Sequence, residues 1–355
     1  MADARNEILD CLPDGVLLID DFRVVRFANR VARELLETDP TDRDLALSVR
    51  HPDVLNAVDA VLGGAAEQTG EMTLASPVPR TFGVHAVTVG GRLPESEIAV
   101  VLVLNDITAS KRAEQMRADF VSNASHELRS PLASMLGFVE TLKGPASDDA
   151  PARARFLDIM HRETRRMARL IDDLLSLSRV EINEHIRPTG TVDVATVLLN
   201  VAELLGAQAA NDGMEIKLEL PDDLPRAMGN ADELTQVFRN LVENAIKYGS
   251  DGTPVTLRAE PVERISGSGT RGMVVHVIDE GEGIPADSLP RLTERFYRVD
   301  DSRVREENAS VPSTGLGLAI VKHIISRHRG RMDVSSEVGT GSTFSVHLPV
   351  HQDTP

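Results

Sequence analysis

Two long amphipathic segments between residues 106 and 184 constrain the fold of this chain more than any other feature. Lys143–Pro151, with two prolines, one glycine and two aspartates, predicts a turn between them. Such a hairpin buries little apolar surface alone, so we expect two copies to form an antiparallel four-helix bundle, with packing onto a neighbouring domain as the alternative. The apolar residues recur at helical spacing: Met116, Phe120, Ala124, Leu128, Leu132, Leu136 and Val139, then Phe156, Met160, Met167, Ile171 and Leu174.

The pattern differs on either side of this hairpin and predicts three domains, 1–105, 106–184 and 193–350. The first reads as mixed α/β, and Asn183–Asp193 reads as a linker. The third alternates helices and strands, which predicts an α+β domain with helices on a sheet. In the first domain we expect strands at Val16–Ile19, Val24–Phe27, Arg80–Val89 and Glu97–Leu104, and a helix at Ala28–Leu36. In the third we expect helices at Val194–Ala210, Ala231–Tyr248 and Leu316–Arg329, and strands at Met214–Leu220, Val255–Pro261, Met273–Asp279, Arg331–Ser335 and Thr343–Leu348.

Composition and net charge limit the kinds of partner and the cellular location expected for the chain. Its 355 residues are 41% hydrophobic and carry a net charge of −17, which argues against nucleic acid and anionic membranes. A single cysteine, Cys11, cannot form an internal disulfide. The longest apolar run, Ile98–Leu104, is too short for a transmembrane segment, so we expect a cytoplasmic protein; membrane association through a partner or through an anchor outside this sequence stays open.

His126 is the most informative residue of the first amphipathic segment. At about 100° per residue it lies about 200° from both Ala124 and Leu128, so it faces away from the apolar stripe. This disfavours a core histidine and leaves a solvated or a reactive one. The helix of a zinc protease would need a second histidine four residues after His126. Ser130 occupies that position, so we do not expect a zinc site.

A neutral imidazole can attack phosphorus through one ring nitrogen. Glu127 can hold the opposite N–H, which fixes the tautomer and raises nucleophilicity. Pro131 removes a backbone donor and predicts a bend just past the site.

Four short motifs in the third domain suit a nucleotide. Asn240, Asn244 and Lys247 share a helical face that suits an oxygen ligand for Mg²⁺ and a cation near phosphates. Asp279, Gly281 and Gly283 follow an apolar strand, where glycine allows close approach of a ligand. Thr314–Leu318 opens a helix, whose free N–H groups attract phosphate, and Gly339–Phe344 reads as a hairpin. Each motif alone is weak.

Together the motifs over about residues 106–350 resemble bacterial sensor histidine kinases. Ser125–Leu132, with the sequence SHELRSPL, resembles their phosphoacceptor box, in which threonine is commonest at the place of Ser130. The four later motifs resemble the asparagine box and the three glycine boxes, and Arg295–Arg298 resembles the phenylalanine box. The resemblance implies that His126 is phosphorylated from Mg-ATP and passes the phosphoryl group to an aspartate of a response regulator. It also implies a role for Ser130 in dephosphorylating that partner.

The same resemblance implies an ATP-binding sandwich of the histidine-kinase and Hsp90 type. Asn244 is then the Mg²⁺ ligand, Asp279 accepts a hydrogen bond from adenine, and Ile284–Thr314 is a lid, in which Pro312-Ser313 replaces the usual glycine pair. Related ATPases carry a glutamate where this chain has Asn240, so a hydrolytic base is missing and a kinase is favoured over an ATPase. The other residues implied to contact the nucleotide are Asn240, Lys247, Tyr248, Gly281, Gly283, Arg298, Thr314, Gly315, Leu316, Gly317, Leu318 and Thr343.

The first domain is similar to a PAS domain at Leu9–Asp21 and Arg23–Arg30, and Asn105–Thr108 resembles the usual exit of that domain into a helix. We expect it to bind no cofactor, although His51 or His85 could ligate haem. This arrangement resembles the cytoplasmic part of phosphate-regulon kinases. Partner specificity is expected near His126 and at an arginine cluster that could equally be a solvated helix face: Arg162, Arg165, Arg166 and Arg169.

Overall fold

The computed structural model describes residues 2–74, 79–89, 98–144, 148–183, 185–265, 269–299 and 314–350. Contacts divide the chain into two compact units, Met1–Ser122 and Asn123–Pro355.

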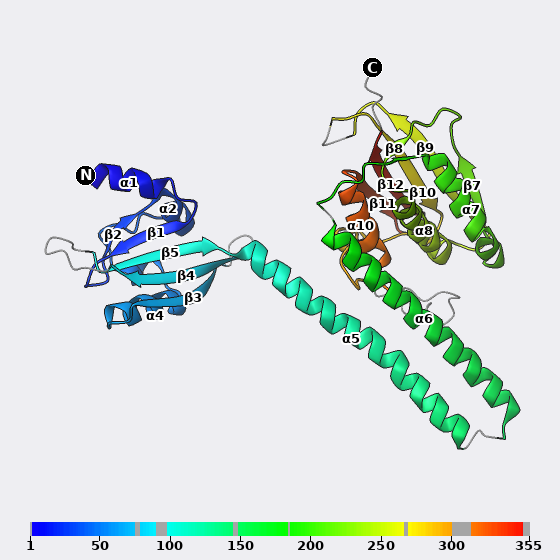
Figure 1. Cartoon of the computed structure of the whole chain (residues 1–355), viewed down its shortest axis with the longest axis horizontal. Helices are drawn as coiled ribbons and strands as arrows, with labels where there is room; N and C mark the ends of the chain where they lie inside the picture. Colours follow the sequence, from blue (N-terminus) through cyan, green and yellow to red (C-terminus); the bar gives the residue numbers. More distant parts are fainter. Residues whose placement is uncertain are drawn as a thin grey trace. The chain divides into compact units, whose positions relative to one another are not determined.

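A five-stranded antiparallel sheet in the order β2-β1-β5-β4-β3 forms the N-terminal unit (Figure 1). Alternate residues of β4 and β5 are buried, so one face of the sheet builds the core, and α4 packs against β3 and β4 there. The predicted α/β class of this region is confirmed. Its elements are α1 (Ala2–Asp10), β1 (Gly15–Ile19), β2 (Val25–Ala28), α2 (Arg30–Leu36), α3 (Leu45–Ser48), α4 (Pro52–Leu62), β3 (Glu67–Leu74), β4 (Arg80–Thr88) and β5 (Val100–Asp106).

The observed elements of this unit differ from the sequence prediction at several places, and two of these have a clear physical reason. The helix predicted from Ala28 begins at Arg30, because Ala28 ends β2 and the Oδ1 of buried Asn29 accepts a hydrogen bond from the Ala32 N–H at 2.9 Å. Strand β3 was not predicted. It is a sheet edge with a polar sequence in which only Met72 is fully buried, so it lacks the apolar alternation of a strand.

Asp106 makes the junction between the sheet and the next helix, α5 (Thr108–Lys143). Its carboxylate accepts hydrogen bonds from the Thr108 N–H at 2.9 Å and from Arg80 Nη2 at 2.5 Å. Hydrogen bonds from the side chains of Thr108 and Arg80 lower the pKa of Asp106 to about 2. The charged carboxylate therefore stabilises the N-terminus of α5.

The predicted hairpin consists of α5 and α6 (Ala150–Ile182). Asp149 Oδ1 accepts a hydrogen bond from the Ala152 N–H at 2.9 Å, so α6 starts inside the stretch that the sequence assigned to the turn. Helix α5 continues through Pro131 without a break. The rings of Phe138 and Phe156 stack 5.2 Å apart between the two helices.

Helix α6 has a second apolar face that the sequence analysis did not separate from the first. Leu170, Leu177 and Val180 are buried, and α6 packs against α10 (Gly317–Arg327). The alternative considered for the hairpin, packing onto a neighbouring domain, is therefore observed for this face of α6. Large apolar side chains of the other surface are exposed, among them Leu132, Leu136, Leu157, Ile171 and Leu175.

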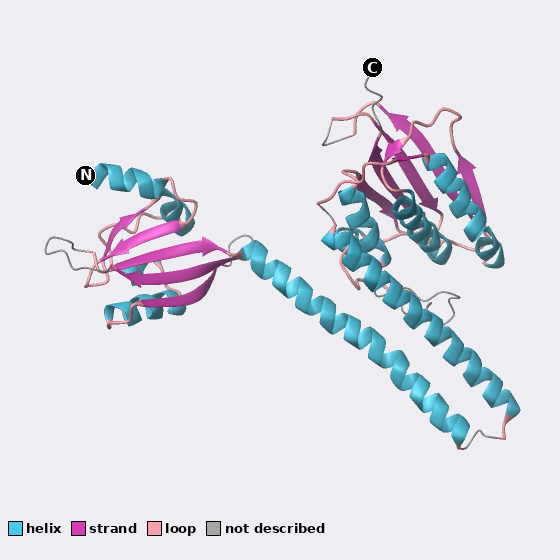
Figure 2. Ribbon diagram, in the orientation of Figure 1, coloured by secondary structure: helices cyan, strands magenta, loops and turns pink. Residues whose placement is uncertain are grey.

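The rest of the C-terminal unit is a two-layer sandwich (Figure 2). Its sheet has the order β11-β12-β10-β9-β7, with only β7 and β9 parallel, and α7, α8 and α10 cover one face. The core includes Leu234, Phe238 and Leu241. The elements are β6 (Thr191–Val192), α7 (Val194–Asn211), β7 (Glu215–Glu219), β8 (Ala227–Met228), α8 (Ala231–Tyr248), β9 (Pro254–Val262), β10 (Gly272–Asp279), η1 (Ala286–Arg291), α10, β11 (Arg331–Glu337) and β12 (Gly341–Pro349).

Helix α7 is the one helix among the described residues that has the length and composition of a membrane span. In the sandwich it packs against α8 and β7, and Leu198 and Val201 are fully buried. Its apolar character is thus explained by the core that it helps to build.

Candidate active site

His126 lies on α5 with its side chain exposed, whereas Ala124 and Leu128 on either side are half-buried. The outward position predicted from helical spacing is confirmed. Ser130, one turn later, is also exposed. A second protein can therefore reach both side chains on this surface of α5.

Glu127 is engaged by the second helix of the hairpin. Its Oε2 accepts a hydrogen bond from Arg166 Nη2 at 3.0 Å, and both side chains are partly shielded from solvent. The sequence analysis placed Arg166 in a cluster for partner recognition or solvation, and it missed this pairing. Thirty-nine residues separate the two side chains, so no local pattern could have indicated it.

Asp279 lies at the end of β10 and is 6% exposed. Its Oδ1 accepts hydrogen bonds from the N–H groups of Gly281 at 3.0 Å and Ser342 at 3.2 Å. Burial raises the pKa of this carboxyl, and the two backbone donors oppose the rise. Within the described part of the chain, hydrogen bonding occupies Oδ1 alone, which leaves Oδ2 as an acceptor for a ligand.

The motif around Asp279 also needs glycine. Gly283 has a φ of +71°, and a Cβ there would collide with the carbonyl of Glu337. A Cβ on Gly281 would collide with the carbonyl of Tyr248. Thr343 of β12 is half-buried beside this region and pairs with Ile278 of β10.

The predicted phosphate loop begins at Thr314 and leads into α10. Thr314 Oγ1 accepts a hydrogen bond from the Leu316 N–H at 3.3 Å, and buried Asn240 donates through Nδ2 to the Gly317 carbonyl at 3.3 Å. Leu316 is buried, and Leu318 is half-buried on the first turn of α10. Asn240 therefore ties α8 to the loop.

Asn244, Lys247 and Tyr248 follow on α8. Asn244 is half-buried, and Lys247 Nζ lies 5.0 Å from the centroid of the Tyr248 ring. Burial lowers the pKa of Lys247, and the positive charges of Arg298 and Arg166 lower it further. The charges of Lys247 on α8 and of Arg298 after η1 therefore act on each other, and two such cations together suit a polyphosphate.

The structure describes the predicted lid, Ile284–Thr314, only up to residue 299 and again from Thr314. The described part contains η1 and a half-buried Arg298. The departure noted at Pro312-Ser313 lies outside the described residues.

Polar contacts between described residues join α6 to the sandwich, and the sequence analysis predicted none of the following three. Asp173 Oδ2 accepts a hydrogen bond from Thr314 Oγ1 at 2.8 Å, and Glu181 Oε1 lies 2.5 Å from Arg295 Nη2. Burial raises the pKa of Asp173. The third contact joins Ser176 and Gln236, whose amide nitrogen donates to the serine hydroxyl at 2.7 Å. Thr314, expected to contact the nucleotide, is thus hydrogen-bonded to helix α6 of the hairpin.

Comparisons with known families agree with this geometry. Residues 229–352 match the histidine kinase-, DNA gyrase B- and HSP90-like ATPase family, residues 116–182 the His Kinase A phospho-acceptor domain, and residues 6–68 the PAS domain. The chain is 34% identical over 353 residues to the phosphate regulon sensor protein PhoR of Pseudomonas aeruginosa, covering 98% of this chain and 74% of that one.

The chain belongs to the sensor histidine kinases. It is also 32% identical to the sensor-like histidine kinase SenX3 of Mycolicibacterium smegmatis, over 98% of this chain and 86% of that one. Among solved structures, ShkA in complex with AMPPNP is 26% identical, with a TM-score of 0.47 over 68% of this chain and 47% of that one. The kinase therefore has the predicted activity class, an ATP-dependent protein-histidine kinase of the PhoR type.

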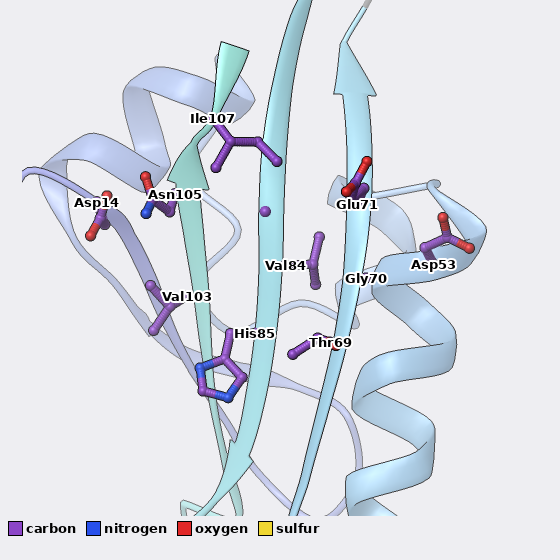
Figure 3. A pocket seen from close by; sticks show the side chains of 11 residues that line it. Asp14, Asp53, Thr69, Gly70, Glu71, Val84, His85, Val103, Asn105 and Ile107 are labelled. Carbon is purple, nitrogen blue, oxygen red and sulfur yellow. The ribbon is translucent and has the colours of Figure 1, made fainter. Parts of the chain in front are cut away.

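The PAS unit of the kinase has a groove of about 700 Å³ over β3, β4 and β5 (Figure 3). His85, Val103 and Asn105 line it. His85 Nε2 lies 3.2 Å from Glu67 Oε2, so the histidine that the sequence left open as a haem ligand is paired with a carboxylate.

Proposed function

We propose that His126 is the phosphoacceptor of this kinase and that it passes the phosphoryl group to an aspartate of a response regulator. The observation that carries the proposal is the exposed imidazole, adjacent to a carboxylate on a helix whose partner α6 contacts the nucleotide domain. In the first step a neutral ring nitrogen attacks the γ-phosphorus of ATP. The N–P bond forms while the bond from phosphorus to the bridging oxygen breaks, and ADP leaves with that electron pair.

The imidazole ring carries a positive charge once the N–P bond has formed. It becomes neutral when the proton on its other nitrogen moves to Glu127. In the second step a carboxylate oxygen of the response regulator attacks the phosphorus, the N–P bond breaks with its electron pair returning to His126, and Glu127 gives its proton back to the ring, which leaves a neutral imidazole. Ser130 provides a hydroxyl at the same surface, and we assign to it the alignment of water when the partner is dephosphorylated.

For the nucleotide we propose that Asp279 accepts from the adenine amino group and that Lys247, Arg298 and the Thr314–Leu318 loop receive the phosphates. Mg²⁺ fits beside them at Asn244. The half-buried amide of Asn244 makes no hydrogen bond to other described residues, and Mg²⁺ in nucleotide sites takes one or two protein oxygens with the rest from phosphate and water. The metal would neutralise phosphate charge during transfer.

We further propose a cytoplasmic homodimer, with domains at 1–105, 106–184 and 193–350. The exposed apolar stripe that includes Leu132 and Leu136 supports the dimer, because a contiguous apolar surface of this kind is typical of an interface.

The test of the phosphoacceptor uses γ-labelled ATP and the full chain. We expect label that is labile in acid and stable in base, and we expect His126→Ala to lose it while still binding nucleotide. His161→Ala, which changes an exposed histidine on α6, should keep the label. Label that persists in His126→Ala would refute the assignment, and steady phosphate release without a phosphoprotein would favour an ATPase.

A further inference from the structure

Arg166 on α6 pairs with two carboxylates, one on α5 and one on its own helix. Its guanidinium bonds Glu127, the neighbour of His126, at 3.0 Å, and its Nη1 lies 3.9 Å from Glu163 one turn earlier on α6. Its charge also reaches Lys247 on α8, whose pKa it helps to lower. The geometry therefore joins Arg166 of α6 to the residue next to His126 on α5.

The hydrogen bond to Arg166 occupies one oxygen of Glu127. Within the described residues the other oxygen, Oε1, has no hydrogen-bond partner, and neither has the ring of His126. A glutamate side chain on a helix surface samples several rotamers when nothing holds it. A planar guanidinium that binds one carboxylate oxygen restricts that freedom.

We propose that Arg166 is a positioning residue for autophosphorylation: it holds Oε2 of Glu127 so that Oε1 accepts the N–H of His126. This inference rests on the proposed roles of His126 and Glu127. Arg166 takes no proton and forms no covalent bond. The proton leaves the imidazole for Oε1 as the N–P bond forms, and Arg166 stabilises the orientation of the acceptor.

The test measures autophosphorylation rates under single-turnover conditions, together with the dissociation constant of ATP. We expect Arg166→Ala to slow the chemical step about 10-fold and Glu127→Gln to slow it about 100-fold, the lower range for acid–base assistance. ATP affinity should change by less than about threefold, because Arg166 is not placed as a phosphate ligand. Arg166→Lys should recover part of the rate, since it keeps the charge and loses the planar fork.

The double variant Arg166→Ala/Glu127→Gln separates positioning from other roles. If Arg166 acts through Glu127, the double variant is as slow as Glu127→Gln alone, within about twofold. Arg165→Ala, which removes an exposed arginine next in the chain, should leave the rate unchanged. Thermal melting of each variant reports on folding.

Multiplicative effects of the two changes would overturn the proposal, because Arg166 would then act independently of Glu127. An unchanged rate in Arg166→Ala would overturn it as well. Neither result touches the phosphoacceptor assignment, which fails only if His126→Ala keeps its label.

Discussion

Gly315 and Gly317 lie two residues apart in the proposed phosphate loop, Thr314–Leu318, yet their backbones differ. Gly315 has a φ of +70°, and a Cβ there would lie 2.8 Å from the Phe296 Cα. Gly317 begins α10, and a Cβ there would lie 3.8 Å from Asn240, an ordinary contact. A side chain is therefore excluded at the first position and accommodated at the second.

This difference makes the two glycines a matched pair for a stability measurement. We expect Gly315→Ala to lower the free energy of unfolding by about 2 kcal/mol or more, since it adds left-handed strain and a backbone collision. Gly317→Ala should leave it within about 1 kcal/mol. Urea denaturation measures both, and equal losses would contradict the assigned loop conformation.

Helix α6 contacts both the helix that carries His126 and the proposed nucleotide site. One of its faces packs against α10 through Leu177 and Val180, and Asp173 of the same helix receives the hydroxyl of Thr314. Helix α6 therefore contacts Thr314 through Asp173 and Glu127 of α5 through Arg166. The exposed apolar residues on its other surface are available to pack against a second copy of the chain.

The exposed stripe of α5 allows a direct test of dimer formation. Leu136 is 61% exposed, so a glutamate there is tolerated in a monomer but places like charges in the core of a bundle. We expect Leu136→Glu to change the sedimentation of the kinase from that of a dimer to that of a monomer. Ser134→Glu, two residues earlier on the opposite helix face, should leave the dimer intact. A dimeric Leu136→Glu would locate the interface elsewhere.

For the molecule as a whole, buried ionisable groups make stability depend on pH. His328 is 1% exposed; its Nδ1–H donates to the Ile324 carbonyl at 2.8 Å and its Nε2 accepts from the Asn230 N–H at 3.1 Å. Because a backbone N–H can only donate, the ring is neutral in the fold. Burial lowers the pKa of His328 below its ordinary value of 6.5.

The sign of the effect follows from proton counting. Below pH 6.5 the unfolded chain binds a proton at His328 that the folded chain excludes, so the free energy of unfolding falls as the pH falls, by at most about 1.4 kcal/mol per pH unit. We expect His328→Gln to reduce this slope in urea denaturation between pH 7.5 and 5.5. Identical slopes would show that His328 titrates normally in the fold. The raised pKa values of Asp173 and Asp279 affect the free energy of unfolding with the opposite sign. They do so equally in the unchanged kinase and in His328→Gln, so the difference between the two slopes is due to the histidine.

Periodicity and local chemistry in the sequence predicted most elements and supplied the candidate residues of the site. Helix Ala231–Tyr248 was predicted with its observed bounds, since Asn230 caps it and Gly249 follows it. The outward position of His126 followed from helical spacing alone. The polar edge strand β3 was missed because pairing with β4, not its own pattern, makes it a strand.

Only the tertiary structure decided how the site is connected. Arg166 reaches Glu127 across 39 residues, and Asp173 reaches Thr314 across 141. Contacts at such separations depend on how α6 packs against α5 and α10, and that packing is the sum of many weak apolar contacts without a local signature. The sequence alone therefore predicted the candidate reactive groups of this kinase, and the fold decided which side chains contact them.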